Sequence, residues 1–174
     1  RLADLGITAI ELMPIADFPG SRNWGYDGVL PFAPAAAYGT AAELKRLIDH
    51  AHELGLSVLL DVVFNHFGPD GCYLHTHSPE FFKGGSQTPW GAGIDFDRPE
   101  VRGFYRACAL QWLDEFRFDG LRFDAVHAIP STEFLLELER DIRAALPKDR
   151  HVHLIVENED NDADLLGAYD AQWN

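Results

Sequence analysis

The sequence is poor in basic residues and has no long apolar run. With 14 Lys and Arg against 28 Asp and Glu, the 174-residue chain carries a formal charge of −14, which repels phosphate backbones and anionic lipid. No stretch of about 18 uncharged apolar residues, the length that crosses a bilayer, occurs. We therefore expect neither a nucleic-acid nor a membrane partner.

Cysteine is also scarce. Cys72 and Cys108 are far apart, which excludes a disulfide framework and fits a reducing compartment, so we expect a cytoplasmic location. The start of the chain lacks the order of basic, apolar and small residues of a signal peptide, and it has no initiating Met. We interpret the sequence as part of a longer chain.

Strand and helix patterns alternate along the chain. Apolar runs rich in β-branched residues predict four strands buried on both faces, at 7–13, 57–64, 121–126 and 152–156. Residues 40–43 form a capping box before a helix that Gly55 ends, and helical spacing recurs after Pro99 and before Pro147. This alternation predicts right-handed βαβ units and a parallel α/β sheet.

Two architectures fit such a sheet, an open doubly wound sheet and a closed (β/α)₈ TIM barrel. No glycine-rich phosphate turn follows any predicted strand, which disfavours a nucleotide fold and an oxidoreductase. Polar residues gather at the strand ends, which is the catalytic face of a barrel. Residues 1–174 would then be a partial catalytic barrel domain, covering about half (strands 2 to 5 or so), and 67–96 would be a long loop excursion over that face.

Four charged residues at these strand ends form the strongest candidate site. Arg122 and Asp124 share one face of a strand, so Arg122 can hold Asp124 ionised. Glu157 could then be the protonated partner if its surroundings are drier, and two carboxyls with separated pKa values suit a glycosidase. The alternative from spacing alone is a buried ion-pair network, including Asp61, that only closes the barrel.

Three stretches resemble motifs of the α-amylase family of glycoside hydrolases. They are residues 61–66 (DVVFNH), 118–127 (FDGLRFDAVH) and 156–158 (VEN), with 23–28 (NWGYDG) upstream. The resemblance implies a (β/α)₈ barrel that acts with retention on α-glucosidic bonds, with Asp124 as nucleophile and Glu157 as general acid/base. The third carboxylate of the family follows a later strand, beyond the last residue of this sequence.

The resemblance also implies roles for the neighbouring side chains. Arg122 would orient Asp124, His66 would bind the sugar at the cleavage subsite, and Tyr26 would stack beneath it. Further candidates for sugar contact are Trp24, Trp90 and His127, and the supporting residues are Asp61 and Asn65. In some relatives the position of Asn65 helps to hold calcium, but neither a metal nor a cofactor is predicted here.

Other stretches narrow the resemblance within the family. Residues 66–74, 88–96, 151–158 and 169–174 resemble the trehalose-releasing members, which implies hydrolysis of the α-1,4-glucosidic bond next to the trehalose end of malto-oligosyltrehalose. Glycogen branching or another reaction on α-glucans is the nearest alternative, and a carbohydrate-binding barrel without catalysis is an alternative of another class.

Histidine pairs are the remaining signal for a metal. His75 and His77 lack a nearby cluster of cysteine or carboxylate, so we expect solvation or capping there. His151 and His153 flank a predicted strand, and we expect packing or solvent contact for them.

Overall fold

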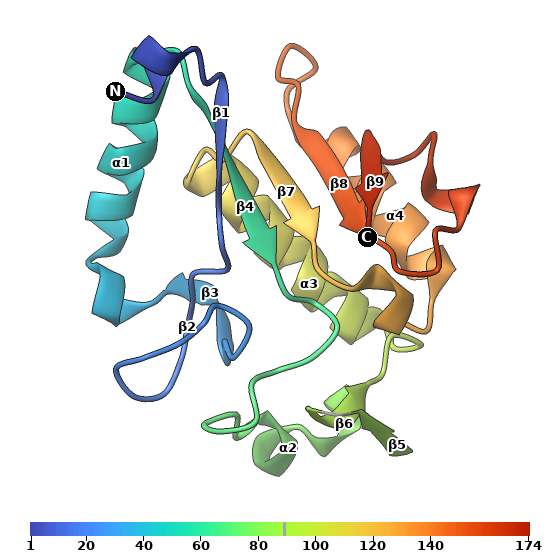
Figure 1. Cartoon of the computed structure of the whole chain (residues 1–174). Coiled ribbons are helices and arrows are strands. Elements are labelled where there is room, and N and C mark those ends of the chain that lie inside the picture. Colours follow the sequence, from blue (N-terminus) through green and yellow to red (C-terminus); the bar gives the residue numbers. More distant parts are fainter. Residues whose placement is uncertain (89) are drawn as a thin grey trace.

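A computed structural model describes residues 1–88 and 90–174, and Pro89, within the stretch 88–96, lies outside the described residues. Figure 1 shows a five-stranded sheet at the centre of the molecule, in the order β1 (Ala9–Leu12), β4 (Ser57–Val62), β7 (Gly120–Phe123), β8 (His153–Glu157) and β9 (Ala171–Trp173). All neighbouring pairs are parallel. Each strand joins the sheet beside the one before it, as in a barrel, whereas a doubly wound sheet reverses its order.

Helices connect the strands and lie outside the sheet (Figure 1). They are α1 (Ala41–Glu53), α3 (Pro99–Leu110) and α4 (Thr132–Ala145), and α3 continues into a π-helical turn, Gln111–Glu115. Smaller elements are β2 (Ala16–Asp17), β3 (Leu30–Pro34), α2 (Leu74–His77), β5 (Phe82–Thr88) and β6 (Gly91–Ile94). In Figure 1, α2 and the β5–β6 hairpin lie beyond the carboxyl ends of β4 and β7.

The start of α1 confirms the predicted capping box. The Glu43 backbone N–H donates to Thr40 Oγ1 (3.2 Å), and Glu43 Oε2 accepts from the Thr40 backbone N–H (2.8 Å). These two bonds satisfy backbone donors that the first helical turn leaves unpaired. Gly55 follows the last turn with φ +74°, the left-handed conformation that glycine adopts without strain, so the helix ends as predicted.

The sheet has one apolar and one partly polar face. Alternate residues of β4, β7 and β8 are at most 1% exposed and form the apolar core with the helices: Val58, Leu60, Leu121, Phe123, Leu154 and Val156. The opposite face carries Asp61 and Arg122, which are paired in register and only 4% and 7% exposed. A buried carboxylate requires a charged partner, so this face is built around ion pairs.

The structure differs from the sequence prediction in several places. The strand β1 was predicted to be buried on both faces, but none of its residues is buried, and the short pair β2 and β3 was not predicted. The third strand ends at Phe123, so Asp124 follows the strand instead of lying on it. A fifth strand, β9, was not predicted, because its three residues are too short to show a period. The segment 67–96 is not a plain loop, since it contains α2 and the β5–β6 hairpin.

Two further observations concern the class of protein. In the part of the chain that the structure describes, every helix is too short or too polar to span a bilayer. Cys72 and Cys108 are both free thiols, Cys108 buried within α3, as expected of a chain without a disulfide framework.

Candidate active site

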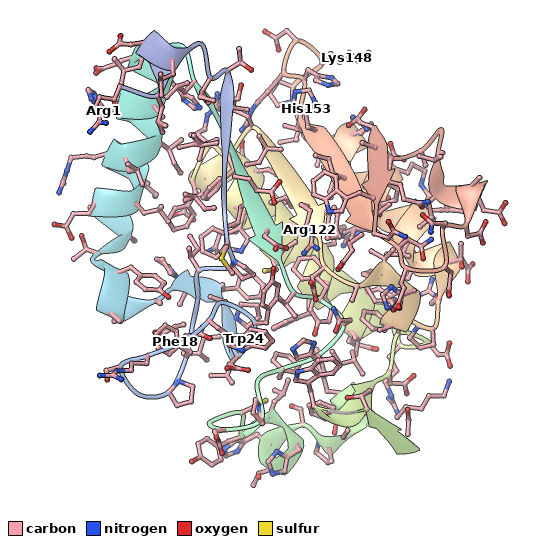
Figure 2. The ribbon with its side chains drawn as sticks, viewed as in Figure 1. Arg1, Phe18, Trp24, Arg122, Lys148 and His153 are labelled. Atoms are coloured by element: carbon pink, nitrogen blue, oxygen red, sulfur yellow. The ribbon has the colours of Figure 1, made fainter. Side chains whose placement is uncertain are left out.

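Three adjacent strands bring the predicted charged residues together at their carboxyl ends. Asp61 lies near the end of β4, Arg122 near the end of β7, and Glu157 is the last residue of β8. Figure 2 shows Arg122 between His153, at the start of β8, and Trp24, in the loop before β3. The convergence follows from parallel register, because strands of one direction end at one edge.

Arg122 is the centre of this cluster. Its Nη1 donates to both carboxylate oxygens of Asp61 (2.8 Å each) and to Asp124 Oδ1 (2.9 Å), while Nη2 lies 2.9 Å from Glu157 Oε2. The side chains of Arg122, Asp61 and Asp124 are 8%, 4% and 12% exposed, so these contacts are little screened by water. One guanidinium therefore fixes three carboxylates.

Asp61 links this cluster to the aromatic Tyr26. The Tyr26 hydroxyl donates to Asp61 Oδ2 at 2.9 Å. Burial raises the pKa of Asp61 to about 6, although the hydrogen bonds from Arg122 and Tyr26 lower it in part. Burial, together with the neighbouring Asp61 carboxylate, raises the pKa of Tyr26 to about 12, so the phenol stays a donor at neutral pH.

A second set of bonds positions Asn65 and His66. Asn65 Nδ2 donates to the backbone oxygen of Asp124 (2.9 Å) and to its Oδ2 (3.0 Å), and Asn65 Oδ1 contacts His66 Nδ1. His66 Nε2 lies 2.9 Å from the backbone oxygen of Tyr26. Burial lowers the pKa of His66, and the bond to the Tyr26 carbonyl offsets part of this effect.

The loops that carry Tyr26 and His66 also touch through their backbones. The Gly68 N–H donates to the Gly28 oxygen at 3.0 Å, and a Cβ atom on Gly68 would lie 2.1 Å from the Asp27 oxygen. No residue other than glycine fits this approach without separating the loops.

Glu157 is held by a backbone group that sequence reasoning did not find. The Ala125 N–H donates to Glu157 Oε2 at 2.8 Å, and Ala125 itself has φ +43°, an uncommon conformation for a residue with a side chain. The Glu157 side chain is 28% exposed against 12% for Asp124. The drier surroundings that we considered for Glu157 are therefore absent here.

Two exposed aromatic rings pack against residues of the site. Trp24 is 64% exposed and packs edge-on against Tyr26 with centroids 5.4 Å apart. Trp90, in the turn of the β5–β6 hairpin, stacks on His66, with the ring centroids 4.4 Å apart and an angle of 18° between the ring planes. Flat exposed rings beside hydrogen-bonding groups are what a sugar-binding surface needs.

His127, predicted as a further candidate for sugar contact, lies beside the end of β8, where both of its ring nitrogens contact Glu159. Its Nδ1 accepts from the Glu159 backbone N–H at 3.2 Å, and Nε2 is 3.5 Å from Glu159 Oε2. The structure thus brings all of the predicted site residues to one edge of the sheet, with Asp61, Arg122, Asp124 and Glu157 in direct contact and Trp24 and His127 at the border.

Comparisons with known proteins agree with this geometry. The family described as "Alpha amylase, catalytic domain" matches residues 1–84. The malto-oligosyltrehalose trehalohydrolase of Deinococcus radiodurans is 46% identical over 144 residues, 81% of this chain and 24% of that protein. The 1,4-alpha-glucan branching enzyme of Mycobacterium bovis is 42% identical over 134 residues, 72% of this chain and 18% of that enzyme.

A solved structure is also similar to this chain. The putative alpha amylase from Salmonella typhimurium superposes with a TM-score of 0.94 at 46% identity, over 99% of this chain and 31% of that one. The chain spans between about a quarter and a third of the length of the trehalohydrolases it matches. Its parallel sheet is part of a TIM barrel, and the chain belongs to the α-amylase family of glycoside hydrolases.

Proposed function

We propose that the full-length protein is a retaining glycoside hydrolase that cleaves the α-1,4-glucosidic bond next to the trehalose end of a malto-oligosyltrehalose and releases trehalose. The observation that carries the proposal is the pair Asp124 and Glu157, held by one guanidinium at the ends of adjacent strands. The similarity to a trehalohydrolase over 81% of the chain supports the substrate.

Asp124 is suited to be the nucleophile. Arg122 Nη1 donates to its Oδ1 and Asn65 Nδ2 donates to its Oδ2, so two donors fix the direction of the side chain. Attack of Asp124 on the anomeric carbon would form a glycosyl-enzyme, which water then hydrolyses.

Glu157 is suited to be the general acid and then the base. Retaining enzymes place their two carboxyls about 5–5.5 Å apart, and a positioned acid contributes about 10² to 10⁴ in rate. The ion pair with Arg122 and the hydrogen bond from the Ala125 N–H both end on Glu157 Oε2, and together they fix the direction of this carboxyl group.

The remaining residues would hold the sugar. We assign stacking beneath the cleaved glucose to Tyr26, a contact with the same glucose to His66, and outer contacts to Trp24 and His127. Asp61 and Asn65 would act as positioning residues, since each binds a group that touches the substrate. The two free cysteines support a location in the cytoplasm.

Product analysis tests this proposal. The full-length protein is incubated with maltotriosyl-trehalose and, separately, with maltopentaose, and free trehalose is measured. We expect trehalose from the first substrate and little attack on the second, with the α-anomer appearing first by NMR. Asp124→Asn should lose nearly all turnover, Glu157→Gln should lose about 10² to 10⁴ in rate, and Asp4→Asn, whose side chain is 88% exposed, should lose none.

Other outcomes would overturn parts of the proposal. General shortening of maltopentaose would indicate an amylase, and branched products would indicate a branching enzyme. If wild type bound glucans without turnover, the protein would be a carbohydrate-binding barrel. Near wild-type activity of Asp124→Asn would remove the assignment of the nucleophile.

A further inference from the structure

Three potential metal ligands meet at the end of the sheet opposite the candidate active site. His151 and His153 lie at the start of β8 and Asp170 immediately precedes β9, its parallel neighbour. One ligand atom from each residue lies within 4.8 Å of the others, and all three residues are exposed. Figure 2 shows His153 at the start of β8, at the far end of the sheet from Trp24.

The extended backbone explains why the two histidines converge. Residues two apart in a strand point to the same face, and here exposed His151 and His153 alternate with the buried Val152 and Leu154. Their rings are 4.7 Å apart. His75 and His77 have the same spacing but lie on the helical turn α2, where residues two apart do not face each other.

Asp170 is fixed in place before any ligand arrives. Its Oδ2 accepts from the Leu154 backbone N–H at 2.8 Å and from Arg143 Nη2 at 3.1 Å. Among the described residues, the hydrogen bonds to this carboxylate end on Oδ2, which leaves Oδ1 for a further partner. Such a fixed carboxylate loses little conformational entropy on binding a cation.

We propose that His151, His153 and Asp170 bind one divalent transition-metal ion of the Zn²⁺ class. Two imidazole nitrogens and one carboxylate oxygen are ligands that Zn²⁺ takes, with water in the fourth position, whereas Ca²⁺ and Mg²⁺ prefer oxygen ligands alone. His153 is four residues from Glu157 along β8, or roughly 13 Å. The ion therefore ties the starts of β8 and β9 together and takes no part in glycoside hydrolysis.

Metal titration of the full-length protein tests the site. We expect one saturable Zn²⁺ site by competition with a chromophoric chelator, unaffected by excess Ca²⁺. His151→Ala and His153→Ala should each weaken binding at least about tenfold. His75→Ala and His77→Ala are matched controls and should leave the affinity unchanged.

Zn²⁺ binding by Asp170→Asn is a third test. A melting curve of this variant is measured beside it, because Asp170 also binds Leu154 and Arg143 and its loss can change stability without any metal. Zn²⁺ should raise the melting temperature of wild type and of the two control variants, and not that of His153→Ala. Absence of saturable binding, or equal losses in the His75 and His153 variants, would overturn the site.

Discussion

Replacing Arg122 with Met should destabilise the protein in a pH-dependent manner. Met keeps most of the aliphatic stem but removes the guanidinium that binds Asp61, Asp124 and Glu157. Breaking a buried ion pair costs about 3–5 kcal/mol, because the remaining charge stays buried without a partner. We expect a loss of this size in the free energy of unfolding at pH 7.5.

The same loss should shrink at pH 4.5. Burial already raises the pKa of Asp61, and without the guanidinium that pKa rises further, so Asp61 binds a proton as the pH falls and the penalty for its buried charge disappears. Denaturant titration of the full-length protein at both pH values measures the difference. Arg106→Met is the matched control, since Arg106 is 50% exposed and pairs with Asp141 at the surface, and should cost at most about 1 kcal/mol. A penalty for Arg122→Met that is the same at both pH values would refute the reasoning, because lost packing does not depend on protons.

Three further predictions concern single contacts. Burial raises the pKa of Asp61 from 3.8 to about 6, so the contribution of this group to stability is present below pH 4 and is lost as the pH rises through 6. Asp61→Asn should therefore flatten the pH dependence of the unfolding free energy by about 3 kcal/mol over this window, and an unchanged slope would contradict this prediction. Thr40→Ala removes the side-chain cap of α1 and should cost about 1 kcal/mol in denaturant unfolding, whereas a neutral effect would mean that the cap is redundant. Trp90→Ala removes the ring stacked on His66 and should raise KM for the glucan about two- to tenfold with little change in kcat, whereas a fall in kcat alone would assign Trp90 another role.

The parts of the fold that could be predicted from the sequence are those that depend on short-range residue patterns. The capping box at Thr40 and Gly55 at the end of α1 depend on neighbours within a few residues, so they can be recognised without tertiary contacts. The meeting of Asp61, Arg122 and Glu157 was also predictable, because it needs only strand direction and position at the strand end. Their roles in catalysis stay predictions.

Contacts between segments far apart in the chain could not be predicted from the sequence pattern. The stack of Trp90 on His66 depends on how the β5–β6 hairpin folds back over the sheet, and that hairpin contains glycines without a clear period. The bond from the Ala125 N–H to Glu157 uses a backbone donor that every residue has. The cluster at His153 needed the register of β8 against β9, a strand too short to predict.

The glycine contact between the loops of Tyr26 and His66 divides the candidate sugar-binding surface into a fixed part and an adjustable part. With Gly68 against the Asp27 carbonyl, any larger residue at position 68 would push the two loops apart, so their relative position is fixed. The hairpin that carries Trp90 contacts this surface through aromatic rings, with Trp90 stacked on His66 and Phe82 packed against Phe67, and ring contacts can shift more than a backbone contact closed by glycine. In the glycoside hydrolase that we propose, a change of preferred glucan would therefore arise most readily in the hairpin, with the carboxylates and their guanidinium left untouched.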